Sequence, residues 1–154
     1  MKLTTLSRED QLTLCRAVER LCGARLRDIR GFADPHDKPL LKVLDERVED
    51  GRTQLRALER LDRGDPASLR AEDTQRFVRE YFPSQRSGIG EGPLTRDVAL
   101  YLAECVEDER SRFYHELSAA AGEPDTRELF RQLAARDEEH LKFLRTVLLY
   151  NLSE

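Results

Sequence analysis

An aspartate and a histidine stand one helical turn apart near the end of the chain, at Asp137 and His140. Both interrupt an apolar stripe with spacings of three and four residues: Phe130, Leu133, Ala134, Leu141, Leu144, Val147 and Leu148. Side chains three positions apart on an α-helix point the same way, so both would face a core. A buried charge is costly unless it is paired or bound to a metal. The pair therefore indicates either a metal site or a polar pair satisfied by neighbouring side chains or water.

A third candidate ligand, Glu107, lies on the preceding amphipathic segment, on the same helical face as Ala103 and Tyr114. If the turn near Gly122 joins two antiparallel helices, Glu107 and the aspartate–histidine pair lie at similar distances from it along the chain. They would then meet at similar height. Two other glutamates of the segment are alternatives for the inward position, and this charged run could instead be a solvated face: Glu104 and Glu109.

The elements that must position these residues are four long amphipathic segments, each with the apolar periodicity of a helix. We predict helices over residues 7–31, 38–62, 95–121 and 126–149. Short turns with glycine and proline separate the members of each pair, which makes them antiparallel. Residues 63–94 form a long connection, in which Ser68 is expected to cap a short helix ending near Phe82. The sequence thus predicts one all-α domain over residues 1–154, an antiparallel four-helix bundle with a long crossover.

Composition narrows the functional class. Of 154 residues 36% are charged, but the signs interleave and the net charge is −4, which argues against a nucleic-acid partner. No apolar run is long enough to span a membrane, and the first residues contain no apolar segment, so we expect no secretory signal. The odd number of cysteines without close pairing (Cys15, Cys22 and Cys105) indicates a reduced, cytoplasmic protein with cysteines in its core.

Two motifs carry a resemblance to a known family. The chain reads Glu107-Asp-Glu-Arg-Ser-Arg-Phe113-Tyr114 and then Leu133-Ala-Ala-Arg-Asp137-Glu-Glu-His140. The stretch from Leu100 to Leu148 resembles the second half of the ferritin-like, rubrerythrin-type di-iron domain, which has a glutamate before a Phe-Tyr pair and then a Leu-Ala-x-x-Glu-x-x-His helix. The resemblance implies that Glu107, Asp137 and His140 are metal ligands and that Tyr114 faces the interior. Asp137 departs from the pattern, since the family has a glutamate there.

The first pair of helices departs further from that family. It has no Glu-x-x-His, and its nearby histidine, His36, falls in a turn. The carboxylates it offers are Glu19 with either Glu46 or Glu49, and the separation from Glu19 to Glu49 equals that from Glu107 to Asp137.

The residue opposite His140 depends on the register chosen for the second helix. Counting from Glu49 places Arg52 there, and an arginine cannot ligate a metal. The apolar stripe instead places Val48 and Gly51 at the two ligand positions. An arginine inside the bundle could itself neutralise the carboxylates in place of an ion.

The resemblance implies a metal-binding protein of the di-iron type, acting as a ferroxidase or a peroxide-reducing oxidoreductase. The expected ligands of iron, or of another first-row metal, are Glu107, Asp137, His140, Glu19 and Glu49. Electrons would come from an external donor, and a homodimer is expected. The alternative is a non-catalytic ferritin-like bundle with a degenerate site and no metal, serving as a dimerisation or adaptor module.

Overall fold

The computed structural model describes residues 2–61, 63–83, 88–89 and 92–150, with side chains up to Val147. These residues contain a short 3₁₀ helix and five α-helices and no strand, which confirms the all-α class. The bounds are η1 Leu3–Thr5, α1 Arg8–Phe32, α2 Lys38–Glu59, α3 Ala71–Tyr81, α4 Arg96–Ala120 and α5 Pro124–Tyr150. The four long helices lie within three residues of the predicted bounds at either end.

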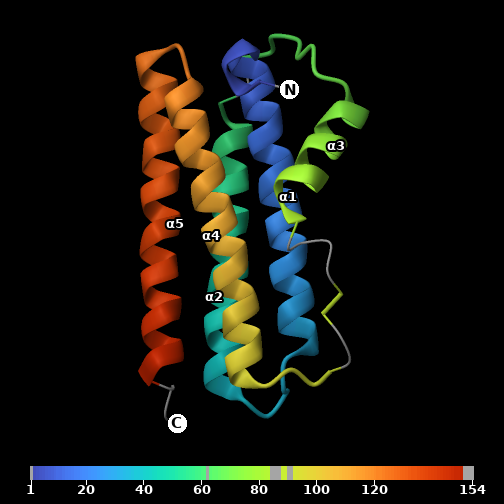
Figure 1. The fold of residues 1–154 in the computed structure, drawn as a ribbon, viewed down its shortest axis with the longest axis vertical. Helices are drawn as coiled ribbons and strands as arrows, with labels where there is room; N and C mark the ends of the chain where they lie inside the picture. Colours follow the sequence, from blue (N-terminus) through green and yellow to red (C-terminus); the bar gives the residue numbers. More distant parts are fainter. Residues whose placement is uncertain (1, 62, 84–87, 90–91, 151–154) are drawn as a thin grey trace.

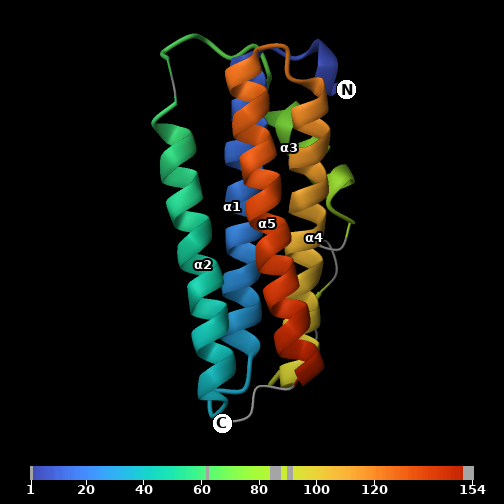
Figure 2. The ribbon, with the colours of Figure 1, turned by 90° about the vertical axis from the view of Figure 1, so that its left-hand side faces the viewer.

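The long helices α1, α2, α4 and α5 run along the long axis of the molecule, and α3 lies obliquely beside α1 (Figure 1). The most extensive packing is between α4 and α5, followed by α1 with α2. The two pairs meet mainly through α1 and α4, and Figure 2 shows α1 behind α5. Within the described part of the chain, no helix is long and apolar enough to cross a membrane.

Side-chain oxygens cap three of the long helices. Ser7 accepts a hydrogen bond from the Asp10 amide at 3.1 Å, and Thr95 accepts one from the Val98 amide at 3.4 Å. Asp37 caps α2 and also receives two hydrogen bonds from the Arg96 guanidinium, at 2.7 and 2.8 Å. The turn between α1 and α2 is thereby tied to the start of α4.

The prediction that Ser68 caps α3 is wrong. The N-cap residue is Arg70, which makes no side-chain cap hydrogen bond. The Ser68 hydroxyl and amide instead donate to the Asp10 carboxylate, at 2.6 and 2.8 Å, and the Leu69 amide adds a third bond at 3.0 Å. A carboxylate on α1 thus holds the connection between α2 and α3 against the helices.

Replacing Asp10 with alanine should lower the free energy of unfolding by about 1.5–3 kcal/mol, because hydrogen bonds to a charged acceptor are lost. Burial raises the pKa of Asp10, but its bonds with Ser68 and Leu69 bring it below 3.8 overall. Its contribution should therefore be present above pH 3.8 and be lost as the pH falls towards the lowered pKa. Urea unfolding at neutral and at acid pH measures the loss of stability and its dependence on pH. Asp28→Ala, at an exposed position of α1, is the control and should change little.

The prediction for the cysteines is partly right. Cys15 and Cys22 are fully buried on α1, whereas Cys105 is only partly buried. None of the three forms a disulfide within the described part of the chain. Burial raises the pKa of the Cys15 and Cys22 thiols well above the ordinary value, so both behave as small apolar core residues.

Candidate metal centre

Six polar side chains from three helices meet inside the molecule, and we call them the buried ionic cluster: Glu19 on α1, Glu107, Arg110 and Tyr114 on α4, and Asp137 and His140 on α5. All except His140 are at least 98% buried as residues, and the His140 side chain is 12% exposed. The residues on α4 follow one another at intervals of three and four, so they share one helical face.

Arg110 lies at the centre of the cluster. Its guanidinium donates to Glu107 at 2.6 Å, to Glu19 at 3.2 Å and to Asp137 at 3.1 and 3.2 Å. An arginine offers five N–H donors in a planar fork, which lets one side chain bind carboxylates from three helices. A buried cation therefore joins α1, α4 and α5.

An arginine in the interior was a possibility left open by the sequence, with Arg52 on α2 as the residue considered. The Arg52 side chain is 56% exposed and pairs with Glu49 on the surface of α2, at 3.5 Å. Arg110 could have been found from its position three residues after Glu107 and four before Tyr114, on the inward face.

Glu49 does not belong to the cluster, contrary to the expected ligand set. Its side chain is 58% exposed and pairs with Arg56 at 3.2 Å as well as with Arg52. The register given by the apolar stripe is the one observed, since Val48 and Gly51 are the buried residues of that part of α2. Helix α2 therefore directs no carboxylate to the centre of the cluster.

Around Arg110 and Glu19, α2 supplies space and an amide. A Cβ atom built on Gly51 would lie 4.0 Å from Nη1 of Arg110, so the glycine leaves room beside the guanidinium. One turn on, Gln54 Nε2 donates to Glu19 Oε1 at 3.2 Å. Tyr114 donates its hydroxyl to the same Glu19 oxygen at 2.6 Å, which fixes that carboxylate from two sides.

The inward glutamate of α4 is Glu107, which resolves the alternatives left by the sequence. Glu107 is fully buried, whereas Glu104 pairs with Arg145 across the outer edge of α4 and α5 at 2.8 Å. Glu107, Asp137 and His140 each offer a ligand atom, and these atoms lie within 4.8 Å of one another. Carboxylate oxygen with imidazole nitrogen is a donor set typical of first-row metals.

Two buried atoms of the possible ligands Glu107, Asp137 and His140 lack hydrogen bonds within the described structure. Among the described residues, neither Glu107 Oε1 nor His140 Nδ1 has a hydrogen-bond partner, although both are buried. His140 Nδ1 lies 3.6 Å from the other Glu107 oxygen, beyond hydrogen-bonding range. Buried polar atoms without partners are uncommon and call for an explanation, such as an ion.

The charges of the cluster do not balance when all its carboxylates are ionised, because Arg110 faces Glu19, Glu107 and Asp137. Burial raises the pKa of Asp137 well above its usual range, and the neighbouring glutamates add to the rise although Arg110 opposes it. Burial likewise raises the pKa of Glu19, against the opposing effect of Arg110. For Glu107, burial is outweighed by Arg110 and His140, so its pKa is lowered. In the protein without an ion, burial thus shifts Asp137 towards its protonated form.

The residues fit one metal ion and not two. A pair of ions would need ligands from α2, where Val48 and Gly51 stand, and would need the space that the Arg110 guanidinium fills. One ion at Glu107, Asp137 and His140 would use the two unpartnered atoms. The expectation of a di-iron site is therefore not met by the donor set.

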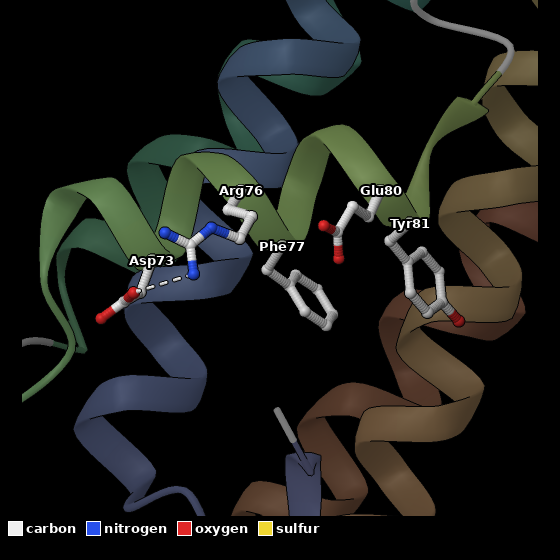
Figure 3. A pocket seen from close by; sticks show the side chains of 5 residues that line it. All are labelled: Asp73, Arg76, Phe77, Glu80 and Tyr81. Atoms are coloured by element: carbon white, nitrogen blue, oxygen red, sulfur yellow. Dashed lines mark ion pairs between the residues drawn. The ribbon is translucent and has the colours of Figure 1, made fainter.

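A surface hollow on α3 is separate from this cluster. It is lined by Asp73, Arg76, Phe77, Glu80 and Tyr81, as Figure 3 shows. Phe77 and Tyr81 pack against Phe113 on α4, with ring centroids 6.0 and 5.6 Å apart, while Asp73 pairs with Arg76 at 3.9 Å. No cluster residue lines the hollow, so it offers the cluster no direct opening.

Comparisons with known protein families, curated proteins and solved structures found no match to the chain. Its function is therefore argued from the contacts, burial and charge of the buried ionic cluster.

Proposed function

We propose that the chain is a ferritin-like four-helix bundle that binds one divalent first-row metal ion at Glu107, Asp137 and His140. The observation that carries this proposal is the pair of buried atoms without hydrogen-bond partners among the described residues, Glu107 Oε1 and His140 Nδ1. They belong to two of the three residues whose ligand atoms lie within 4.8 Å of one another. A metal would satisfy both atoms at once.

Charge supports the same proposal. Arg110 and one divalent ion together carry as much positive charge as the carboxylates of Glu19, Glu107 and Asp137 carry negative charge. Arg110 would then serve as a fixed cation beside the ion, in the place of a second metal. The layout of four long helices, with α3 in the connection between α2 and α4, supports the ferritin-like, crossover-linked fold.

If the ion is iron, it would supply one-electron redox chemistry towards oxygen or peroxide, with electrons from an external donor. The protein's own contribution is to hold the ligands in a dry interior. Arg110 fixes both Glu107 and Asp137, and Tyr114 fixes Glu19 by a 2.6 Å hydrogen bond. The expected homodimer remains a prediction, separate from the metal site.

The second candidate is a non-catalytic bundle with a metal-free ionic core, acting as a dimerisation or adaptor module. It is favoured by the contacts of Arg110, which reaches all three carboxylates at 2.6–3.2 Å. A proton on Asp137 would complete the neutralisation of charge. A buried ionic network of this kind can select one arrangement of helices rather than add stability.

Metal counting separates the two candidates. Anaerobic incubation with ferrous iron, followed by removal of loosely bound ions, should leave about one iron per chain. The folded protein already brings one set of three ligands together, and an ion binds to it as the ligands lose their protons. His140→Ala should lose the iron. His115→Ala is the matched control, because His115 is an exposed histidine on α4 that pairs with Glu138. Iron near zero in the wild type would favour the metal-free core, and about two irons would contradict the role of Arg110.

A further inference from the structure

His140 lies between two carboxylates that come from different helices. Its Nε2 atom is 3.3 Å from Oδ2 of Asp50 on α2, and its Nδ1 atom is 3.6 Å from Oε2 of Glu107 on α4. The contact with Asp50 is the shorter of the two, so Asp50 is the better acceptor for an imidazole N–H. A neutral imidazole carries one such hydrogen. With that hydrogen on Nε2, the lone pair of Nδ1 points towards the buried side of the cluster.

The Asp50 carboxylate is itself held in place by arginines of α2 and α5. Arg47, one turn earlier on α2, pairs with it at 3.1 Å, and Arg136 on α5 approaches it at 3.9 Å. The Arg47 guanidinium also lies over the Phe143 ring of α5, 5.6 Å from its centroid. These contacts give Asp50 a defined orientation, although its side chain is partly exposed.

We infer that Asp50 is a positioning residue for the metal site: by accepting the Nε2 hydrogen of His140, it turns Nδ1 inward as the ligand atom. This inference rests on the proposed function. Asp50 was not among the ligands expected from the sequence. The neighbouring residue Glu49 was among them, but its side chain lies on the surface. The group behind a metal-bound histidine fixes the tautomer and ring orientation, and losing it typically weakens metal binding about 10–100-fold.

Without Asp50, the carboxylate paired with the His140 ring would be that of Glu107, 3.6 Å from Nδ1. Its charge would draw the ring hydrogen to Nδ1, and a metal would then have to displace that hydrogen before binding. Asp50 and Glu107 therefore compete for the ring hydrogen of His140. Asp50 draws this hydrogen to Nε2, which leaves the Nδ1 lone pair available to a metal.

The first test compares the Co²⁺ affinity of the wild type, Asp50→Ala, Asp50→Asn and Glu49→Ala. Asp50→Ala should bind Co²⁺ about 10–100-fold more weakly at unchanged stoichiometry. Asp50→Asn keeps an acceptor oxygen without the charge and should fall between alanine and the wild type. Glu49→Ala removes the adjacent carboxylate, which pairs only with surface arginines in the described structure, and should match the wild type.

The second test needs no metal. Nitrogen-15 NMR of labelled histidine, which distinguishes the two ring nitrogens, should place the His140 hydrogen on Nε2 in the wild type. It should move towards Nδ1 in Asp50→Ala. A wild type already protonated on Nδ1, or a Co²⁺ affinity equal in all four proteins, would overturn the role of Asp50.

The two readouts separate failure of this inference from failure of the proposed function. If the wild type binds no Co²⁺ but its His140 tautomer depends on Asp50, the metal site is wrong and the positioning of the ring by Asp50 is supported. If Co²⁺ binds and neither affinity nor tautomer depends on Asp50, the metal site stands and the role of Asp50 is overturned.

Discussion

Replacing Arg110 with methionine should lower the free energy of unfolding of the metal-free protein by about 3–5 kcal/mol, because breaking a buried ion pair leaves charge without compensation. Three carboxylates would lose their shared cation: Glu19, Glu107 and Asp137. Urea unfolding in the presence of a chelator measures the loss. Arg112→Met is the control, since the Arg112 side chain is 72% exposed and pairs with Asp108 on the same helix. It should cost less than about 1 kcal/mol.

The same variant also tests whether Arg110 takes the place of a cation. Added Zn²⁺ should stabilise Arg110→Met more than it stabilises the wild type, because the carboxylates of the variant lack their fixed cation. If Arg110→Met is as stable as the wild type without metal, the guanidinium does not hold the cluster together. Equal stabilisation of the two proteins by Zn²⁺ would show that Arg110 and the ion do not compensate the same charges.

Replacing Asp137 with asparagine should nearly abolish metal binding while leaving the metal-free protein almost as stable as the wild type. Loss of a ligand should exceed the effect of losing a group behind one, so the affinity for Co²⁺ should fall by more than about 100-fold. Asparagine resembles the protonated acid towards which burial shifts position 137, so the stability should change by less than about 1 kcal/mol wherever Asp137 is protonated in the folded wild type. Glu139→Gln, at an exposed position of the same helix, is the control for both measurements.

The pH dependence of the Asp137→Asn variant follows from the raised pKa. A carboxyl group whose pKa is raised by folding destabilises the folded state as the pH rises from its unfolded value, 3.8, through its folded value. The wild type without metal should lose stability over that interval, and the variant should lose less, since Glu19 alone retains such a shift among the acids of the cluster. Metal affinity of the wild type should rise with pH as Asp137 gives up its proton. Identical pH profiles for the two proteins would show that Asp137 is not protonated in the folded state.

The α4–α5 half of the site could be predicted from the sequence because two local facts determine it. Spacing along each helix places Glu107 on one inward face and both Asp137 and His140 on the other. The short turn between α4 and α5 makes the helices antiparallel, which brings these residues to the same height.

The α1–α2 half could not be obtained in the same way. Counting across the turn between α1 and α2 assumed a turn like the one between α4 and α5, and an error of one residue rotates a helical side chain by about 100°. Glu49 is thereby displaced from the interior to the surface, whereas the apolar stripe gave Val48 and Gly51 correctly. Arg110 was missed for another reason. Its spacing from Glu107 and Tyr114 places it on the inward face of α4, but burial of an arginine becomes plausible only with carboxylate partners from other helices, which the spacing along one helix does not give.

The packing of Gly51 beside Arg110 has a consequence for how the site can change by mutation. A Cβ atom at position 51 would already be in van der Waals contact with the guanidinium, so a histidine ring there would compete with it for space, and loss of the guanidinium alone would leave three carboxylates without their cation. Each single step towards a two-ion site is therefore harmful by itself, although the steps suit one another in combination. Such coupled substitutions are non-additive. The glycine and the arginine form an epistatic barrier, which separates a site with one ion and one guanidinium from a site with two ions.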